Sequence, residues 1–265
     1  MNNQTPNQLK FLKQQKQHQN FVRFTRMFIF VAFLLLWEIT THFGLVDSFI
    51  FSSPSKVILC FWSMVLNKSI FLHIGITLYE TLVSFILVTI LSILIATLLW
   101  FSKKTLEITE PFLVVLNSLP KSALAPLLIV WLGATPKTII VAGMSVAIFG
   151  SIMSMSTNFQ EVDSEKIKLI YTLRGNKCQA LTKVVLPSCV PAIVSNMKVN
   201  IGLCLVGVVI GEFLAARNGL GYLIIYSSQV FKMDWLLMSI VILCVLAMGL
   251  YALISVVEKV YQKYF

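Results

Sequence analysis

Long apolar runs separated by short polar segments make up most of this chain. A transmembrane helix needs roughly 20 predominantly apolar residues to cross about 30 Å of hydrocarbon. Six windows predict six spans, at about residues 27–46, 81–101, 111–133, 138–157, 190–216 and 235–257. A single charged side chain interrupts three of the apolar stretches: Glu38 in the first window, Lys121 in the third, and Glu212 within residues 199–216 of the fifth.

These runs predict an all-α membrane protein. Backbone groups in lipid must be hydrogen-bonded within their own segment or in a closed barrel, and the runs do not alternate as barrel strands do. Of the 21 Lys and Arg residues, 14 fall on the side of both termini, five fall on the other side, and Lys121 and Lys198 are unassigned. The positive-inside rule therefore predicts a multi-pass protein of the cell membrane with both termini in the cytoplasm.

Composition agrees with this class, with 57% hydrophobic and 12% charged residues. The predicted topology accounts for the net charge of +10. No exposed aromatic platform or nucleic-acid module accompanies that charge, so we expect no nucleic-acid partner. The five cysteines and three histidines show no metal-ligand spacing, which predicts no metal site.

The first residues form a segment of different character. Gln, Asn and Lys dominate the start of the chain, so residues 1–24 are expected to be a disordered, basic cytoplasmic tail. Residues 25–265 are then the transmembrane domain. After its first span, Ser55 is a plausible cap for an amphipathic helix that lies along the outer surface.

A polar interruption at residues 158–187 is too short and too polar to span the membrane. Asp163 or Ser164 can cap a first helix, and Gly175 stands where a left-handed helix end is favoured. A second helix is predicted from about Lys177, ending before Pro187. This hairpin can offer an apolar helix side to a soluble partner, or it can be a connecting loop that packs on its own bundle.

Three prolines, Pro111, Pro120 and Pro126, predict a broken third span. Lys121 lies beside the central proline. It can face a pathway and favour anionic or polar cargo, or it can pair with a carboxylate or with carbonyls that Pro120 leaves free. Pro120 and Pro126 join Lys121 as candidate pathway residues.

Another candidate region lies near the outer end of the fifth span. Glu212 is interpreted as a pathway or gate-stabilising residue. Gly219 and Gly221 then open a short outer helix through a flexible turn. That helix can act as an outer gate or docking rim, or it can be a simple surface helix. Glu38 is expected to be structural.

Several motifs together carry a family resemblance. The chain resembles type I ABC importer permeases, and within them the nitrate/sulfonate/taurine-type branch of binding-protein-dependent inner membrane components, from Trp37 to about Val260. The motifs, in order, are Ser53-Pro54-Ser55, Leu119-Pro120-Lys121, Ala123-Leu124-Ala125-Pro126-Leu127, Trp131-Leu132-Gly133, Leu173-Arg174-Gly175-Asn176, Val184-Val185-Leu186-Pro187, Pro191-Ala192-Ile193, Gly207 to Glu212, and Gly219-Leu220-Gly221-Tyr222-Leu223-Ile224.

The resemblance implies that the polar hairpin is the coupling loop that contacts an ATPase. The implied contact residues are Leu169, Ile170, Tyr171, Leu173, Arg174, Gly175, Leu186 and Pro187. The family's Glu-Ala-Ala falls on Leu169-Ile170-Tyr171 in this chain, which is a departure. Bulkier side chains at these positions predict a roomier pocket in the paired ATPase.

The resemblance also implies the partners. It implies two ABC ATPase subunits, an extracytoplasmic solute-binding protein and a homodimer of this chain in the lipid bilayer. The sequence has no phosphate-binding loop of the form GxxxxGK[ST], so we expect no bound cofactor and no enzyme activity here, with ATP used by the partner. The expected cargo is a small polar or anionic solute. The alternatives are an ion-coupled secondary transporter and a structural or signalling subunit.

Overall fold

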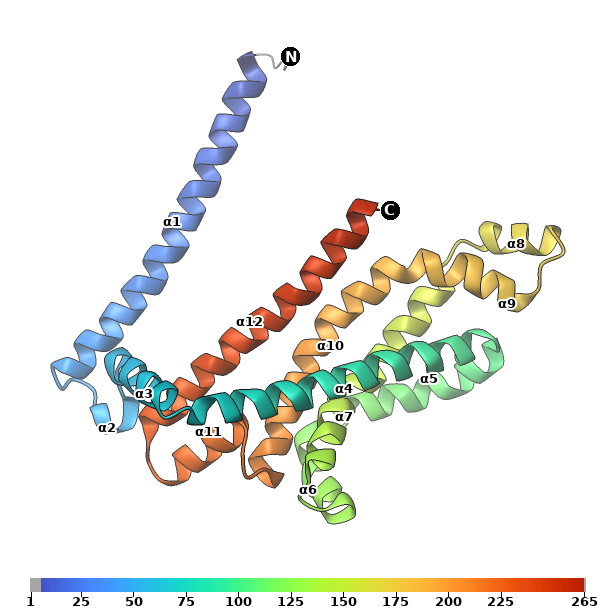
Figure 1. Cartoon of the computed structure of the whole chain (residues 1–265). Helices are drawn as coiled ribbons and strands as arrows, with labels where there is room; N and C mark the ends of the chain where they lie inside the picture. Colours follow the sequence, from blue (N-terminus) through green and yellow to red (C-terminus); the bar gives the residue numbers. More distant parts are fainter. Residues whose placement is uncertain (1–5, 265) are drawn as a thin grey trace.

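The structure is a computed structural model that describes residues 6–264, with side chains described for residues 14–260. Every regular element in this part of the chain is a helix (Figure 1). In chain order they are α1 (Pro6–His42), α2 (Ser48–Phe51), α3 (Pro54–Leu66), α4 (Ser69–Trp100), α5 (Lys103–Ser118), α6 (Lys121–Leu132), α7 (Pro136–Gln160), α8 (Ser164–Thr172), α9 (Lys177–Ala180), the π-helix η1 (Leu181–Val185), α10 (Leu186–Ala215), α11 (Leu220–Gln229) and α12 (Met233–Tyr264).

Four uninterrupted helices are long and apolar enough to cross a membrane. They are α4, α7, the continuous stretch Lys177–Ala215 and α12. The pair α5 and α6 passes the same test as one broken span, which gives up to five spans among the described residues. These five correspond to the predicted spans from residue 81 onward. The sixth predicted span, residues 27–46, lies mainly in α1, which is not among these helices, and it stays a prediction.

Helix α1 changes the expectation for the N-terminal segment. Residues 6–24, which we expected to be disordered, form the first part of α1, and residues 1–5 lie outside the described residues. The physical reason is local. Lys and Gln are good helix formers, and no glycine or proline separates them from the apolar residues that follow. Helix α1 packs mainly on α2 and α3, and Figure 1 shows most of its length standing apart from the other helices.

The predicted break in the third span is confirmed, and Pro120 marks its position. Helices α5 and α6 meet at an angle of 93°. Leu119 and Pro120 are extended there, as expected for a proline and the residue before it. Pro111 and Pro126 lie inside α5 and α6 and do not end either helix.

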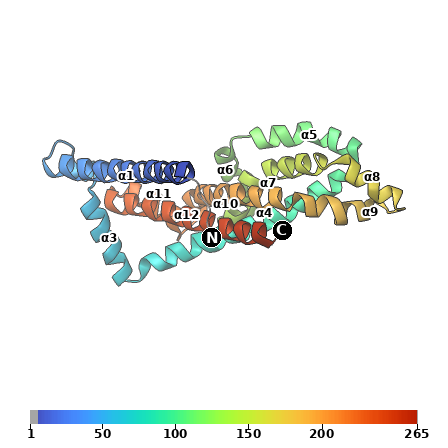
Figure 2. The ribbon, with the colours of Figure 1, turned by 90° about the horizontal axis from the view of Figure 1, so that it is seen from above.

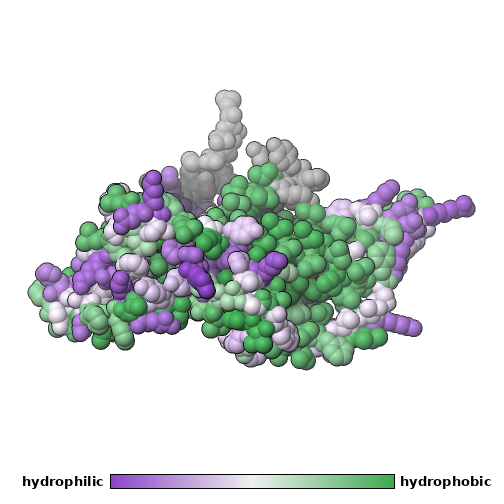
Figure 3. Space-filling view, turned by 60° about the horizontal axis from the view of Figure 1, so that its bottom comes forward, coloured by the Kyte–Doolittle hydropathy of each residue, from purple (hydrophilic) through white to green (hydrophobic). Residues whose placement is uncertain are grey.

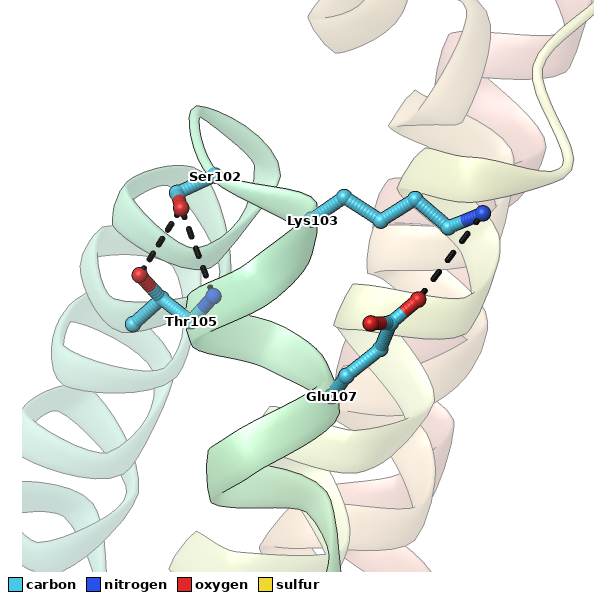
Figure 4. Close-up of polar contacts among 4 residues, drawn as sticks. All are labelled: Ser102, Lys103, Thr105 and Glu107. Carbon is cyan, nitrogen blue, oxygen red and sulfur yellow. Dashed lines mark hydrogen bonds and ion pairs between the residues drawn. The ribbon is translucent and has the colours of Figure 1, made fainter.

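The turn from α4 into α5 is fixed by local polar contacts (Figure 4). The Ser102 hydroxyl accepts a hydrogen bond from the Thr105 backbone N–H at 3.3 Å and contacts the Thr105 hydroxyl at 2.9 Å. Lys103 and Glu107 form an exposed ion pair at 3.8 Å, one helical turn apart. An exposed pair of this kind contributes little stability, so Ser102 is the main local determinant of where α5 begins.

The core is built from α4, α7 and α10, which lie against one another (Figure 2). Small residues allow α7 and α10 to approach closely. A Cβ atom on Gly207 would lie 2.8 Å from the Ala142 carbonyl oxygen and from the Gly143 Cα. A buried polar centre joins the three helices, since Ser151 of α7 donates to Ser92 of α4 and accepts hydrogen bonds from α10.

The predicted surface helix after the first span is α3, but its cap differs from the prediction. Ser53, and not Ser55, accepts a hydrogen bond from the Lys56 N–H, while Pro54 opens the helix. Proline is favoured at the first helical position because its missing N–H has no partner there, which moves the cap one residue before it. Ser55 instead donates its hydroxyl to Glu38 at 2.6 Å, a contact that supports the structural role expected for Glu38.

One face of the molecule is hydrophobic through its middle and hydrophilic toward its two ends (Figure 3). Many of the exposed side chains on the long helices are large and apolar, such as Ile90 and Leu94 of α4 and Val245 of α12. In a water-soluble protein, contiguous surface of this kind is rare. Its place on helices long enough to span a bilayer indicates contact with lipid or with other transmembrane helices.

Candidate functional site

The chemistry-bearing residues gather at opposite ends of the bundle. Helices α8 and α9 lie at one end, and α3 and α11 lie at the other (Figure 1). The bent pair α5 and α6 joins these regions along the side of α7. We call the two ends the α8 end and the α11 end.

Helix α8 begins as predicted. Asp163 is the cap, and its carboxylate accepts a hydrogen bond from the Glu165 N–H at 2.9 Å. An acidic cap also interacts favourably with the positive end of the helix dipole. The polar interruption at the α8 end therefore starts a regular helix at the residue that the sequence indicates.

The end of α8 corrects the role expected of Gly175. Arg174, with φ of 58°, holds the left-handed conformation, and Gly175 does not. The Gly175 N–H donates to the Ile170 carbonyl at 2.8 Å and the Arg174 N–H to the Tyr171 carbonyl at 3.0 Å, which is the hydrogen-bond pattern of a Schellman motif.

Gly175 is required for space. A Cβ atom there would lie 2.8 Å from the Ile170 carbonyl oxygen and would overlap the Ile170 Cγ2. Its N–H and this carbonyl approach each other only because position 175 lacks a side chain. The glycine thus fixes the fold of the hairpin turn through a close approach rather than through a positive φ.

The second helix of the hairpin does not end before Pro187, contrary to the prediction. Helix α9 continues through η1 into α10 without a break, so Lys177–Ala215 is one helical stretch. The Leu186 N–H donates to the Leu181 carbonyl, five residues back, and Pro187 follows in the first turn of α10. A π-turn of this kind rearranges the bonding just before a residue that has no N–H, and the helix passes through.

The hairpin is firmly attached to the bundle. The Lys177 ammonium donates to the Phe101 carbonyl at the end of α4 at 2.6 Å and lies 5.7 Å from the Trp100 ring centre. Leu181 and Val185 are buried in a cluster with Phe159 of α7. The hairpin therefore contacts α4 and α7 and is continuous with α10.

The predicted contact residues divide into two groups. Leu169, Tyr171 and Leu173 are exposed, with 59%, 45% and 71% of their surface accessible. Arg174 and Pro187 are also exposed. Ile170, Gly175 and Leu186 are half-buried and belong to the fold of the hairpin itself.

Lys121 lies at the break between α5 and α6. Its ammonium donates to the Leu116 carbonyl at 2.6 Å and lies 5.3 Å from the ring centre of Phe149. Leu116 is four residues before Pro120, so its carbonyl is the one that a helical N–H at position 120 would have bonded. This contact matches the alternative in which Lys121 satisfies a carbonyl freed by Pro120.

Glu212 is the centre of a buried cluster at the α11 end. Its side chain is fully buried and accepts hydrogen bonds from the Thr77 hydroxyl at 2.6 Å and the Gly221 N–H at 2.5 Å. Thr77 in turn accepts from the Leu220 N–H at 2.8 Å. The cluster therefore caps the N-terminus of α11 and ties it to α4 and α10.

Both predicted gate glycines are needed for the close approach of the α11 N-terminus to the Glu212 carboxylate. A Cβ atom on Gly221 would lie 2.7 Å from a Glu212 carboxylate oxygen, and one on Gly219 would overlap the same carboxylate. Gly219 also has φ of 117°, which side chains rarely allow. The structure thus brings Glu212 into contact with Gly219 and Gly221, and leaves Lys121, the other charged pathway candidate, elsewhere.

Sequence reasoning missed three residues of the cluster. Thr77 bonds Glu212, the His73 ring contacts the Gly219 backbone at 3.1 Å, and the buried carboxyl group of Glu80 lies against that of Glu212. The charge-free window that marks the second span begins at residue 81, one position after Glu80. Extending that window by one helical turn would have revealed an intramembrane carboxyl group.

Within residues 14–260, whose side chains are described, no group of three or more His, Cys, Asp or Glu side chains could hold a metal ion. The cysteines in this range are all free thiols. What the two ends offer is an exposed apolar helix face and a closed hydrogen-bonded cluster.

Comparison with known proteins agrees with this architecture. The protein family described as "Binding-protein-dependent transport system inner membrane component" matches residues 88–263. This match includes α5 to α11, the whole α8–α9 hairpin and the Glu212 cluster apart from its α4 residues.

Individual relatives and solved structures are similar to most of this chain at low sequence identity. A Bacillus subtilis (strain 168) protein described as an aliphatic sulfonates transport permease is 25% identical over 231 residues, which cover 87% of this chain and 84% of that protein. The formylaminopyrimidine transport permease protein of Halalkalibacterium halodurans is 24% identical over 194 residues, 73% of this chain and 76% of that protein. A chain in an inward-facing structure of the MetNI methionine ABC transporter has the same fold, with a TM-score of 0.66, 16% identity, and coverage of 74% of this chain and 97% of that one.

Proposed function

Because this chain belongs to the family of binding-protein-dependent transport system inner membrane components, and is therefore a non-catalytic permease of an ABC transporter, we propose that two copies form the translocation pathway of an importer. Two ATPase subunits dock on the two α8–α9 hairpins. A solute-binding protein delivers cargo at the α11 end. ATP is bound and hydrolysed by the partner ATPases.

The observation that carries this proposal is the combination of attachment and exposure at the hairpin. Lys177 and the Phe159 cluster fix the hairpin to α4, α7 and α10, while Leu169 and Leu173 remain exposed. An apolar helix face that is held rigidly and left uncovered suits a groove on a soluble partner. Closure of two ATPases would then move the long helices through this contact.

The three residues that stand in place of Glu-Ala-Ala differ in their burial. Ile170 packs toward Gly175 and is half-buried, whereas Leu169 and Tyr171 point outward. We therefore assign the partner contact to Leu169, Tyr171 and Leu173, and assign Ile170 to the fold of the hairpin. The cognate ATPase should have a groove wide enough for a tyrosine.

Tyr171→Ala and Ile170→Ala test this division. Tyr171→Ala should weaken co-purification of the ATPase at least about tenfold, as expected for an aromatic anchor at an interface, with little change in thermal stability. Lys168→Ala, one turn away on an exposed position, is the matched control. Ile170→Ala should lower stability first and ATPase binding second. Undiminished ATPase binding by both variants would contradict the packing of these bulky side chains in the ATPase groove.

The proposed orientation follows the distribution of Lys and Arg. Family membership makes the chain a multi-pass inner membrane protein. We propose that both termini and the α8 end face the cytoplasm, that the α11 end faces outward, and that α1 supplies a sixth span. The apolar cavity of about 620 Å³ between α1 and α12, lined by residues such as Trp37 and Leu236, supports membrane placement of α1.

The proposed cargo is a small polar or anionic solute, with sulfonates as the first class to test. The Bacillus subtilis relative is described as an aliphatic sulfonates permease, and Lys121 is a cation at the bend of a broken span. The Halalkalibacterium halodurans relative favours formylaminopyrimidines as a second candidate. Ligand-induced thermal shifts of the associated binding protein, with both classes as probes, distinguish them.

Lys121→Met tests the pathway role of the lysine. If Lys121 contacts cargo, uptake should fall while assembly with the ATPase stays normal. Unchanged uptake would leave Lys121 with a structural role, through its contacts with the Leu116 carbonyl and the Phe149 ring. An ion-coupled secondary transporter, the rival function, would instead show ion-dependent uptake by this chain without an ATPase.

A further inference from the structure

A small cavity at the α11 end is lined by a buried carboxyl group. It has a volume of about 210 Å³ and lies between α4, the start of α7 and the end of α10. Glu80 forms part of its wall, together with apolar residues such as Ile76 and Ile139. Arg217 and Asn218, in the exposed loop after α10, also line it.

Glu80 has an unsatisfied oxygen. The residue is 1% exposed, and its Oε2 has no hydrogen-bond partner among the described residues. The carboxyl group beside it, that of Glu212, already accepts hydrogen bonds from Thr77 and Gly221. A buried carboxylate without a partner is costly, so either a proton shared with Glu212 or a bound cation should complete the site.

The C-terminal end of α10 lies beside this cavity. Ala215 and Ala216, at the C-terminus of the helix, line the cavity. Within the described part of the chain, no backbone N–H donates to the carbonyls of Phe213, Leu214 or Ala215. The last carbonyls of a helix carry its partial negative charge and can contribute ligands to a cation.

We propose that this cavity binds a monovalent inorganic cation, of the size of Na⁺ or K⁺, at Glu80. A carboxylate, helix-end carbonyls and a few waters are suitable ligands for such an ion. A divalent ion is disfavoured, since Ca²⁺ takes six to eight oxygen ligands, usually with more carboxylates. The described residues include no cluster of three acidic or other metal-binding side chains.

Arg217 is the competing occupant within the chain. Its side chain is exposed, and the described residues contain only two ion pairs, neither of which includes Arg217. A guanidinium has five N–H donors, and the mostly apolar wall of this cavity offers few acceptors for them. A small cation that keeps part of its hydration shell needs fewer acceptors from the lining than a guanidinium does.

The bound ion would join α4 to the end of α10, beside the loop that leads to α11. It would therefore stabilise the closed arrangement of the Glu212 cluster. The proposed cation site depends on the geometry of the α11 end alone. It holds whether or not the chain carries sulfonates and whether or not the hairpin binds an ATPase.

The test is a comparison of salts on the full-length chain in lipid nanodiscs. Thermal unfolding is followed in NaCl, KCl and N-methylglucamine chloride at equal ionic strength and pH. We expect the Tm to be higher by about 3 °C in one or both inorganic salts, with a saturable dependence on concentration. Equal Tm values of the unmodified chain in all three salts would overturn the proposal without any variant.

Three variants locate the site. Glu80→Gln and the cavity-filling Ala216→Leu should both abolish the difference between salts, and Arg217→Gln should retain it. A difference that persists in both Glu80→Gln and Ala216→Leu would place the cation elsewhere. If the unmodified chain shows no difference and Arg217→Gln gains one, the guanidinium occupies the cavity and the proposal is wrong.

Discussion

The two ends of the bundle use similar sequence elements for opposite purposes. Each has a glycine whose missing side chain allows a close approach, Gly221 against Glu212 and Gly175 against Ile170. At the α11 end the result is closed, because Glu212 is fully buried and bonded to its neighbours. At the α8 end the result is open, since Leu173 remains 71% exposed.

This contrast separates residues that hold the fold from residues that await a partner. A buried hydrogen-bonded carboxylate is expensive to disturb, because each lost partner leaves a polar group unsatisfied. An exposed apolar side chain on a fixed helix can be replaced at little cost to folding. Substitutions at the α11 end should therefore lower stability, and those at the α8 end should lower function.

Of the glycine variants that distinguish the two ends, Gly221→Ala should lose the most stability. The new Cβ would lie 2.7 Å from the Glu212 carboxylate and 2.9 Å from the Val209 carbonyl, so the start of α11 must move away. Forced overpacking of this kind costs about 1–3 kcal/mol, and the loss of the Gly221 hydrogen bond to Glu212 adds to it. Thermal unfolding of the chain in nanodiscs measures the effect.

Gly75→Ala is the matched control for that prediction. Gly75 is also a helical glycine, in α4, and a Cβ there meets nothing within 4 Å. Its replacement should leave the Tm unchanged or raise it, because alanine is the better helix former. Equal stability of the Gly221 and Gly75 variants would contradict the close packing of the Glu212 cluster.

Gly175→Ala should have an intermediate effect on stability and a larger one on transport. The Cβ would lie 2.8 Å from the Ile170 carbonyl, so the hairpin turn must open, but this strain is confined to an exposed end of the molecule. We expect a stability loss of about 1 kcal/mol, toward the low end for overpacking. Uptake and ATPase binding should fall more than stability, because Leu173 and Tyr171 are displaced together.

Gly202→Ala provides the comparison, since a Cβ at this glycine of α10 also meets nothing within 4 Å. It should leave uptake, ATPase binding and Tm as they are. If Gly175→Ala lowered the Tm as much as Gly221→Ala, the α8 end would be as central to folding as the α11 end. The contrast between the two ends would then fail.

Local signals explain which features could be predicted from the sequence. The Asp163 cap, the break at Pro120 and the long apolar runs each act over one or two turns, so their effects are visible in the sequence. The left-handed residue was misplaced by one position, because glycine is the usual choice there and Arg174 holds it instead. The two hydrogen bonds that close α8 offset the free-energy cost of the left-handed conformation at Arg174.

Features that depend on tertiary contact could not be predicted in this way. Nothing near Pro187 in sequence shows that α9 will continue into α10, because the continuation rests on a π-turn held by burial of Leu181 and Val185. The pairing of Glu80 with Glu212 likewise joins residues from two helices that lie far apart in the sequence. Both cases concern the position of one helix relative to another, which no local pattern specifies.

The smallest effect expected is a difference in cysteine reactivity between the two ends. Cys60 of α3, a surface helix of the α11 end, is partly buried, and burial, aided by the Asp234 carboxylate, raises the pKa of its thiol to about 11. Cys178 of α9 is exposed. The thiolate is the reactive form, so at neutral pH a maleimide should label Cys178 at least about tenfold faster than Cys60, as read by mass spectrometry of peptides. Raising the pH should narrow the gap as Cys60 ionises. Equal rates at neutral pH would show that α3 is not held against its neighbours as closely as the α11 cluster requires.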